Sequence, residues 1–105
     1  MTKKLLTLST RAINLNFMDY YKWNKDKNER LKIERNISFE QITMHIKRGD
    51  VLDIVVHPNQ KKYPGQQLLV VGINNYAYLV PFIENENGKF LKTIIPSRKA
   101  TRDYF

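Results

Sequence analysis

The chain of 105 residues is long enough for one compact domain, and its hydrophobic fraction of 42% can supply a single small core. Its formal net charge of +8 favours an acidic partner. Nucleic acid, an acidic protein and an anionic membrane surface are the three alternatives. The absence of cysteine excludes disulfides and cysteine-based metal sites, and two histidines argue against a structural zinc site. No run of about 18 apolar residues is present, so we expect no membrane-spanning helix.

Residues 1–17 differ from the rest of the chain. They are basic, rich in Thr and Ser, and only loosely periodic, and Arg11 and Asn14 interrupt their apolar run. A secretory signal peptide therefore fits poorly. We interpret this stretch as an N-terminal extension, with Met18 as an alternative start, and assign residues 18–105 to the domain itself.

The first part of the domain has the pattern of a strand followed by two helices. Aromatic residues predict a short strand over residues 17–23. Asn24 is a favourable N-cap for a highly charged helix over residues 25–35. Ser38 and Gln41 have the spacing of a capping box, and apolar residues at helical spacing follow them. A second helix with one buried face is therefore predicted from Ser38 onward.

From Asp50 the period of the sequence changes to that of strands separated by turns. Four strands are predicted, over residues 51–57, 67–73, 76–83 and 90–95. The pair Asn74-Asn75 predicts a tight hairpin, because Asn tolerates positive φ. Consecutive strands with short turns favour an antiparallel meander. Two helices on one face of this sheet and a short C-terminal helix complete a small α+β domain.

Ordinary catalytic constellations are absent from the sequence, which has no Gly-rich phosphate loop, no nucleophile elbow and no suggestive carboxylate pair. His57, at a strand end beside Pro58, is a candidate general acid–base group because imidazole titrates near neutral pH. The competing interpretation, which the position favours, is an ordinary, half-exposed histidine at the end of a strand. His45 lies outside the apolar face of the second helix, so we expect it at the surface.

The basic residues indicate a more specific chemistry. RNA can be cleaved without a metal when Arg and Lys side chains stabilise the charge of the pentavalent phosphate. Aromatic side chains beside them can stack the bases. The residues that combine these properties are Lys27, Lys61, Lys62, Tyr63, Arg98 and Lys99. A basic run is also the composition of an ordinary solvated face, which is the competing interpretation.

Two motifs resemble those of the BrnT-type toxins. Residues 23–27, Trp-Asn-Lys-Asp-Lys, and residues 37–40, Ile-Ser-Phe-Glu, are similar to the family's Trp-Asp-x-x-Lys opening and its Val-Ser-Phe-Glu step into the second helix. Residues 94–101, Ile-Ile-Pro-Ser-Arg-Lys-Ala-Thr, resemble the family's Ile-Ile-Ser-Ala-Arg-Lys-Ala-Thr motif. The likeness covers residues 19–104 with the same element order, and residues 1–17 have no counterpart.

The resemblance implies a RelE-like fold and the toxin of a type II toxin–antitoxin pair, a metal-independent endoribonuclease that arrests growth by cleaving RNA. It further implies a cytoplasmic protein without a cofactor or metal and without membrane contact. The implied partners are the RNA substrate and a ribbon-helix-helix antitoxin. Operator DNA would be bound only through the antitoxin. Lys27 matches the family's helix lysine and Arg98 its motif arginine. We expect the strand over residues 90–95 to bring these two side chains together.

The candidate catalytic residues are therefore Lys27, Arg98 and His57, with Tyr63 as a further candidate for proton transfer. The candidate nucleic-acid-binding residues are Lys62, Tyr63, Lys92, Lys99 and Arg102.

The chain departs from the family at three places, the first of which is Asn24, where the family commonly has Asp. Glu34-Arg35-Asn36 stands for the family's Lys-His-Gly, and Gln66-Gln67 stands for its Glu-Arg. Lys62 or Lys92 would have to replace the missing arginine. The alternative hypothesis is a catalytically weak or inactive relative that acts as an antitoxin- and nucleic-acid-interaction module, and a third is a plain nucleic-acid-binding protein.

Overall fold

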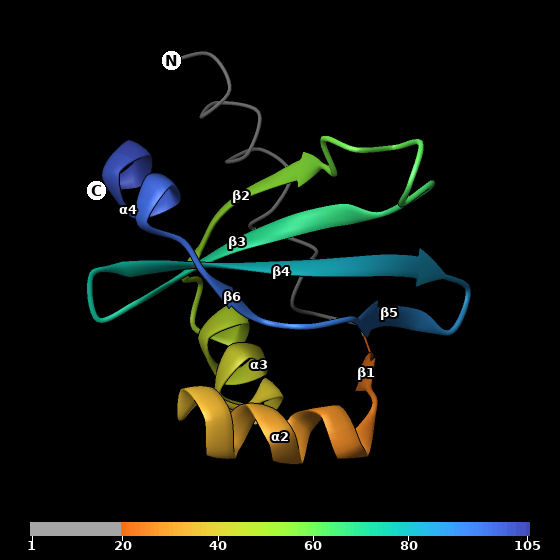
Figure 1. Cartoon of the computed structure of the whole chain (residues 1–105), viewed down its shortest axis with the longest axis horizontal. Coiled ribbons are helices and arrows are strands. Elements are labelled where there is room, and N and C mark those ends of the chain that lie inside the picture. The colour runs from red at the N-terminus through yellow and green to blue at the C-terminus, as the bar shows by residue number, and fades with distance from the viewer. Residues whose placement is uncertain (1–19) are drawn as a thin grey trace.

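The computed structural model describes residues 20–105, so the predicted extension over residues 1–17 lies outside the described part of the chain. Figure 1 shows one twisted sheet with two helices packed on one side and a short C-terminal helix beyond its other side. The elements in chain order are β1 (Tyr21–Trp23), α2 (Lys25–Arg35), α3 (Phe39–Lys47), β2 (Val51–Val56), β3 (Gln67–Ile73), β4 (Tyr76–Asn85), β5 (Gly88–Leu91), β6 (Ile95–Pro96) and α4 (Arg98–Tyr104). The predicted α+β class is therefore confirmed, and the element order is as predicted except at the last strand. Within residues 20–105 no helix combines the length and the apolar character that crossing a membrane requires.

The sheet has the strand order β1-β5-β4-β3-β2, with β6 paired to β4. The pairs from β2 to β5 are antiparallel, as the predicted meander requires. At the turn between β3 and β4, Asn74 and Asn75 have φ of 52° and 65°, which confirms the tight hairpin. The described part of the strand predicted over residues 17–23 is β1, which pairs in parallel with β5 at the edge of the sheet.

The single strand predicted over residues 90–95 is wrong in detail, because the structure divides it into β5 and β6. Both pieces run along β4, with Leu91 opposite Phe82 and Ile95 opposite Leu79. Between these two pairs, the three residues 92–94 lie opposite the two residues 80–81 of β4, as in a β-bulge. Pro81 lies at this break, where its ring offers no N–H to the ladder. The irregular step buries Ile94 completely.

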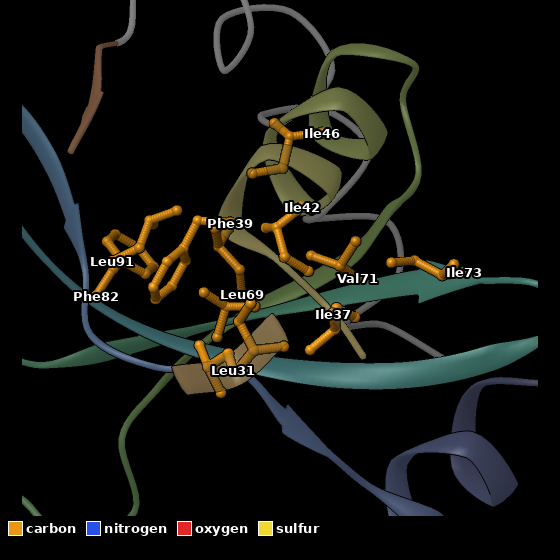
Figure 2. Close-up of a cluster of buried hydrophobic side chains, with 12 residues drawn as sticks. Leu31, Ile37, Phe39, Ile42, Ile46, Leu69, Val71, Ile73, Phe82 and Leu91 are labelled. Carbon is orange, nitrogen blue, oxygen red and sulfur yellow. The ribbon is translucent and has the colours of Figure 1, made fainter. Parts of the chain in front are cut away.

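The main core lies between the sheet and the helices α2 and α3 (Figure 2). It consists of Leu31, Ile37, Phe39, Ile42, Ile46, Leu69, Val71, Ile73, Val80, Phe82, Leu91 and Ile94. The Phe39 ring also stacks on Trp23 of β1, with ring centroids 5.5 Å apart. Because the highly charged helix α2 contributes only Leu31 to this cluster, it depends on this packing for its stability.

Both predicted helix starts are confirmed by their side-chain hydrogen bonds. Asn24 Oδ1 accepts the backbone N–H of Lys27 at 2.8 Å and so caps α2. At α3, Ser38 Oγ accepts the N–H of Gln41 at 3.2 Å, and Gln41 Oε1 accepts the N–H of Ser38 at 3.1 Å. The capping box is therefore complete.

A buried asparagine joins the two helices. Asn28 of α2 is 3% exposed, and its Oδ1 accepts the backbone N–H of Phe39 at 2.8 Å. Its Nδ2 donates to Glu40 Oε1 at 2.8 Å, and this hydrogen bond is the main reason that the pKa of Glu40 lies below its ordinary value. One side chain thus fixes the start of α3 against the middle of α2.

The prediction that His45 lies at the surface is wrong, because the residue is only 8% exposed. Gly49, with φ of 90°, reverses the chain after α3 and returns Asp50 beneath the last turn. There Asp50 donates its N–H to the His45 carbonyl at 2.9 Å, and its Oδ2 lies 2.8 Å from His45 Nδ1. The imidazole is therefore a buried link between the helix and β2.

The C-terminal helix α4 packs on the opposite side of the sheet from α2 and α3, where Ala100 and Tyr104 contact Val70, Ala77 and their neighbours. Thr101 Oγ1 accepts the N–H of Ala77 at 2.8 Å. The Tyr104 hydroxyl donates to Asp53, a carboxylate that is 4% exposed and also accepts the N–H of Ile54 at 2.8 Å. These bonds fix α4 to one end of this face.

Alkaline pH should loosen this attachment. Burial, and then the hydrogen bond with Asp53, raise the pKa of Tyr104 above its ordinary value of 10.0. The neutral phenol therefore contributes stability that is complete below pH 10 and is lost as the pH rises toward the raised pKa, at a rate of at most about 1.4 kcal/mol per pH unit. Urea unfolding between pH 9 and 11.5 should show a steeper loss for the wild type than for Tyr104→Phe. Equal slopes would contradict this role of the phenol.

Candidate nucleic-acid interface

Side chains alternate between the two faces of each strand, so the residues next to the core positions point away from α2 and α3. We call this side, on which α4 packs, the outer face. Helix α4 covers the end that includes Val70 and Ala77. The rest, which we call the uncovered half because no described helix packs on it, is formed in register by Lys22, Val55, His57, Leu68, Pro81, Ile83, Phe90 and Lys92.

The uncovered half combines positive charge with an aromatic ring. Its charged members are Lys22 of β1 and Lys92 after β5, both exposed, and among these strand positions there is no carboxylate. Lys92 Nζ lies 5.5 Å from the centroid of the Phe90 ring, which is itself half-buried. A flat apolar ring flanked by ammonium groups is suited to a stacked base with its phosphates.

The loop between β2 and β3, residues 57–66, adds further groups of the same kind at this end of the sheet (Figure 1). The rings of His57 and Tyr63 lie 4.5 Å apart, and Lys62 Nζ lies 5.4 Å from the centroid of the Tyr63 ring. Both rings are half-buried and Lys62 is exposed. The structure thus brings together the predicted residues His57, Lys62 and Tyr63.

The side chain of Gln60 makes three hydrogen bonds that hold the two ends of the loop together. Its Nε2 donates to the carbonyls of His57 and Gln66 at 2.8 and 3.0 Å, and its Oε1 accepts the N–H of Gly65 at 3.0 Å. The backbone N–H of His57 also donates to the Gln66 carbonyl at 3.0 Å. The two ends of the loop are therefore held together, and the aromatic pair has a defined place.

The remaining predicted cations lie on α4. Arg98, Lys99 and Arg102 are all exposed, and Lys99 Nζ lies 3.3 Å from Asp103 Oδ2. Because α4 packs on the outer face, these side chains are on the same side of the sheet as Lys92, but toward the other end of β4 (Figure 1).

The structure does not bring Lys27 and Arg98 together. Lys27 is half-exposed in the first turn of α2, on the side of the sheet opposite to α4. It is the last turn of α2 that approaches the C-terminal stretch, where Arg35 Nη1 donates to the Ile94 carbonyl at 2.6 Å. At 1.5 Å per residue, Lys27 lies about 12 Å farther back along the helix axis.

Three contributors to this surface were missed by the sequence reasoning. Lys22 and Phe90 lie on the same face because β1 pairs with β5. This contact joins segments far apart in the sequence, and no local pattern predicts it. Gln60 could have been suspected from its place in a loop rich in Asn, Pro and Gly, where side-chain amides often replace backbone partners. Gln67, where the family has arginine, points to the helix side in register with Phe82, so it is not part of the uncovered half.

Comparison of the chain with protein-family models, curated proteins and solved structures finds no match in any of the three. The likeness to BrnT-type toxins therefore stays a prediction from the two motifs.

Proposed function

We propose that this protein is the toxin of a type II toxin–antitoxin pair, a metal-independent endoribonuclease that binds single-stranded RNA on the outer face of its sheet. The observation that carries the proposal is the uncovered half and its loop. Lys22, Lys92 and Phe90 lie toward the β1 edge of this half, and the loop with Lys62 and Tyr63 joins β2 and β3 at the same end of the sheet. The net charge of +8 adds a long-range attraction for RNA. The BrnT-like motifs at both ends of the domain support the same function.

In the proposed reaction the RNA 2′-oxygen attacks the adjacent phosphorus, and the bond from phosphorus to the 5′-oxygen breaks. The products are a 2′,3′-cyclic phosphate and a 5′-hydroxyl, and the 2′-hydroxyl proton is passed to the departing oxygen through solvent. An ammonium group of this face, that of Lys62 or of Lys92, would stabilise the negative charge of the pentavalent phosphate, and the other would bind a neighbouring phosphate. Arg98 lies at the α4 end of the same face.

Induced expression of the full chain is expected to arrest bacterial growth, and purified protein should cleave RNA in the presence of EDTA. Arg98→Ala should relieve the arrest, because it removes a cation from the outer face. Arg30→Ala is the matched control, since Arg30 is exposed on α2 at the other side of the sheet and should leave the arrest intact. Equal growth with and without induction of the wild type would contradict the toxin proposal.

A second candidate function is an interaction module that binds RNA or an acidic antitoxin-like partner without cleavage. The observation that favours it is the separation of Lys27 from Arg98 by the sheet, which leaves the two family cations apart. Purified protein that binds single-stranded RNA tightly, yet leaves it intact after long incubation, would decide for this second function.

A further inference from the structure

The loop over residues 57–66 holds an imidazole, an ammonium group and an aromatic ring in fixed positions. Apart from the three bonds of Gln60, the Asn59 carbonyl accepts the N–H of Tyr63 at 2.9 Å, and Asn59 Oδ1 accepts the N–H of Lys62 at 3.1 Å. The positions of His57, Lys62 and Tyr63 are thus set by hydrogen bonds inside the loop. A ligand that used these three side chains would find them already ordered, which lowers the entropic cost of binding.

One bond in this loop decides the chemistry of His57. Its Nδ1 accepts the backbone N–H of Asn59, with 3.0 Å between the two nitrogens. A neutral imidazole with an accepting Nδ1 carries its hydrogen on Nε2. The opposite tautomer and the imidazolium would both place a hydrogen on Nδ1, against the Asn59 N–H. In this loop His57 is therefore an Nε2–H donor, and it can neither take up a proton nor deliver one without losing the bond.

We propose that this loop is a phosphate-binding site for single-stranded RNA in which His57 acts as a fixed hydrogen-bond donor and not as the acid or base of the reaction. Its Nε2–H would donate to a non-bridging phosphate oxygen, while Lys62 supplies the positive charge and the Tyr63 ring an apolar face for the base. The inference rests on the proposed RNA-binding function, and it names the part of the RNA that His57 contacts.

The test uses the full chain and a fluorescein-labelled, 2′-O-methylated single-stranded RNA, which can be bound but not cleaved. His57→Ala should weaken binding about tenfold, the value of one hydrogen bond to a charged group. His57→Gln keeps an N–H donor of similar reach and should bind within about threefold of the wild type. On unmodified RNA, His57→Gln should lose no more cleavage rate than it loses affinity, whereas the loss of an acid or base would lower the rate about 100-fold or more.

The tautomer itself can be read without RNA from long-range proton–nitrogen correlations of the imidazole. We expect the hydrogen on Nε2 in the wild type, and a mixture of tautomers in Gln60→Ala, in which the loop has lost its three bonds. Hydrogen on Nδ1, or a His57→Gln variant as defective as His57→Ala, would overturn the inference while leaving RNA binding by the wild type in place. A wild type that binds no RNA would refute the proposed function and this inference together.

Discussion

Reversing the charges of Lys62 and Lys92 together is expected to weaken the binding of single-stranded RNA about 100-fold at moderate salt. Both ammonium groups lie beside aromatic rings at the uncovered half, at 5.4 Å from Tyr63 and 5.5 Å from Phe90. If each neutralises one phosphate, the slope of log affinity against log salt should also fall by about 1.4 for the Lys62→Glu/Lys92→Glu variant. Fluorescence anisotropy titrations at several salt concentrations measure both quantities.

The matched control changes the net charge by the same amount on the other side of the sheet. Lys25→Glu/Lys47→Glu alters two exposed lysines, one on α2 and one on α3. It should lose less than a third as much binding free energy as the first double variant. Equal losses in the two variants would mean that overall charge, and not the uncovered half, determines the affinity.

Asn28→Ala is expected to lower the free energy of unfolding by about 2–4 kcal/mol, because it removes two hydrogen bonds at the junction of α2 and α3 and leaves the buried N–H of Phe39 without its acceptor. Urea denaturation at pH 7 measures this loss. The core packing around Leu31 and Phe39 is otherwise untouched, so we expect the variant to fold with lower stability.

The control for this prediction is Glu40→Gln, which keeps an acceptor for Asn28 and should cost less than about 1 kcal/mol. The lowered pKa of Glu40 gives a second readout. Its ionised form contributes stability above the ordinary value of 4.5, and this stability is lost as the pH falls through the lowered pKa. The acid side of the stability profile should therefore be shallower in Asn28→Ala. An unchanged unfolding free energy in Asn28→Ala would show that the junction does not depend on this side chain.

The predictable parts of the fold are those determined by residues close together in the sequence. The caps at Asn24 and Ser38 and the Asn74-Asn75 turn each depend on side chains within three positions, and all three are as predicted. The parallel pairing of β1 with β5 joins segments far apart in the chain, so no local signal indicates it. The same holds for His45, whose burial results from the return of Asp50 beneath its helix.

The candidate site was predictable in its chemistry and not in its arrangement. Residue types and spacing drew attention to Lys62, Tyr63 and His57, and the structure places these three side chains together in one loop. The expected meeting of Lys27 with Arg98 needed α2 and α4 on one side of the sheet, and packing places them on opposite sides. The alternation of a strand tells which residues share a face, but it does not tell which face a distant helix will cover.

The central claim is that RNA lies on the uncovered half of the outer face, and cross-linking tests it most directly. Single-stranded RNA carrying photoreactive 4-thiouridine, irradiated with the full chain and mapped by mass spectrometry, should attach to Tyr63 and Phe90. Tyr76 and Tyr78, whose rings lie 5.6 Å apart on the helix side of β4, serve as internal references and should remain unmodified. Cross-links confined to Tyr76, Tyr78 or the helices α2 and α3 would contradict the claim.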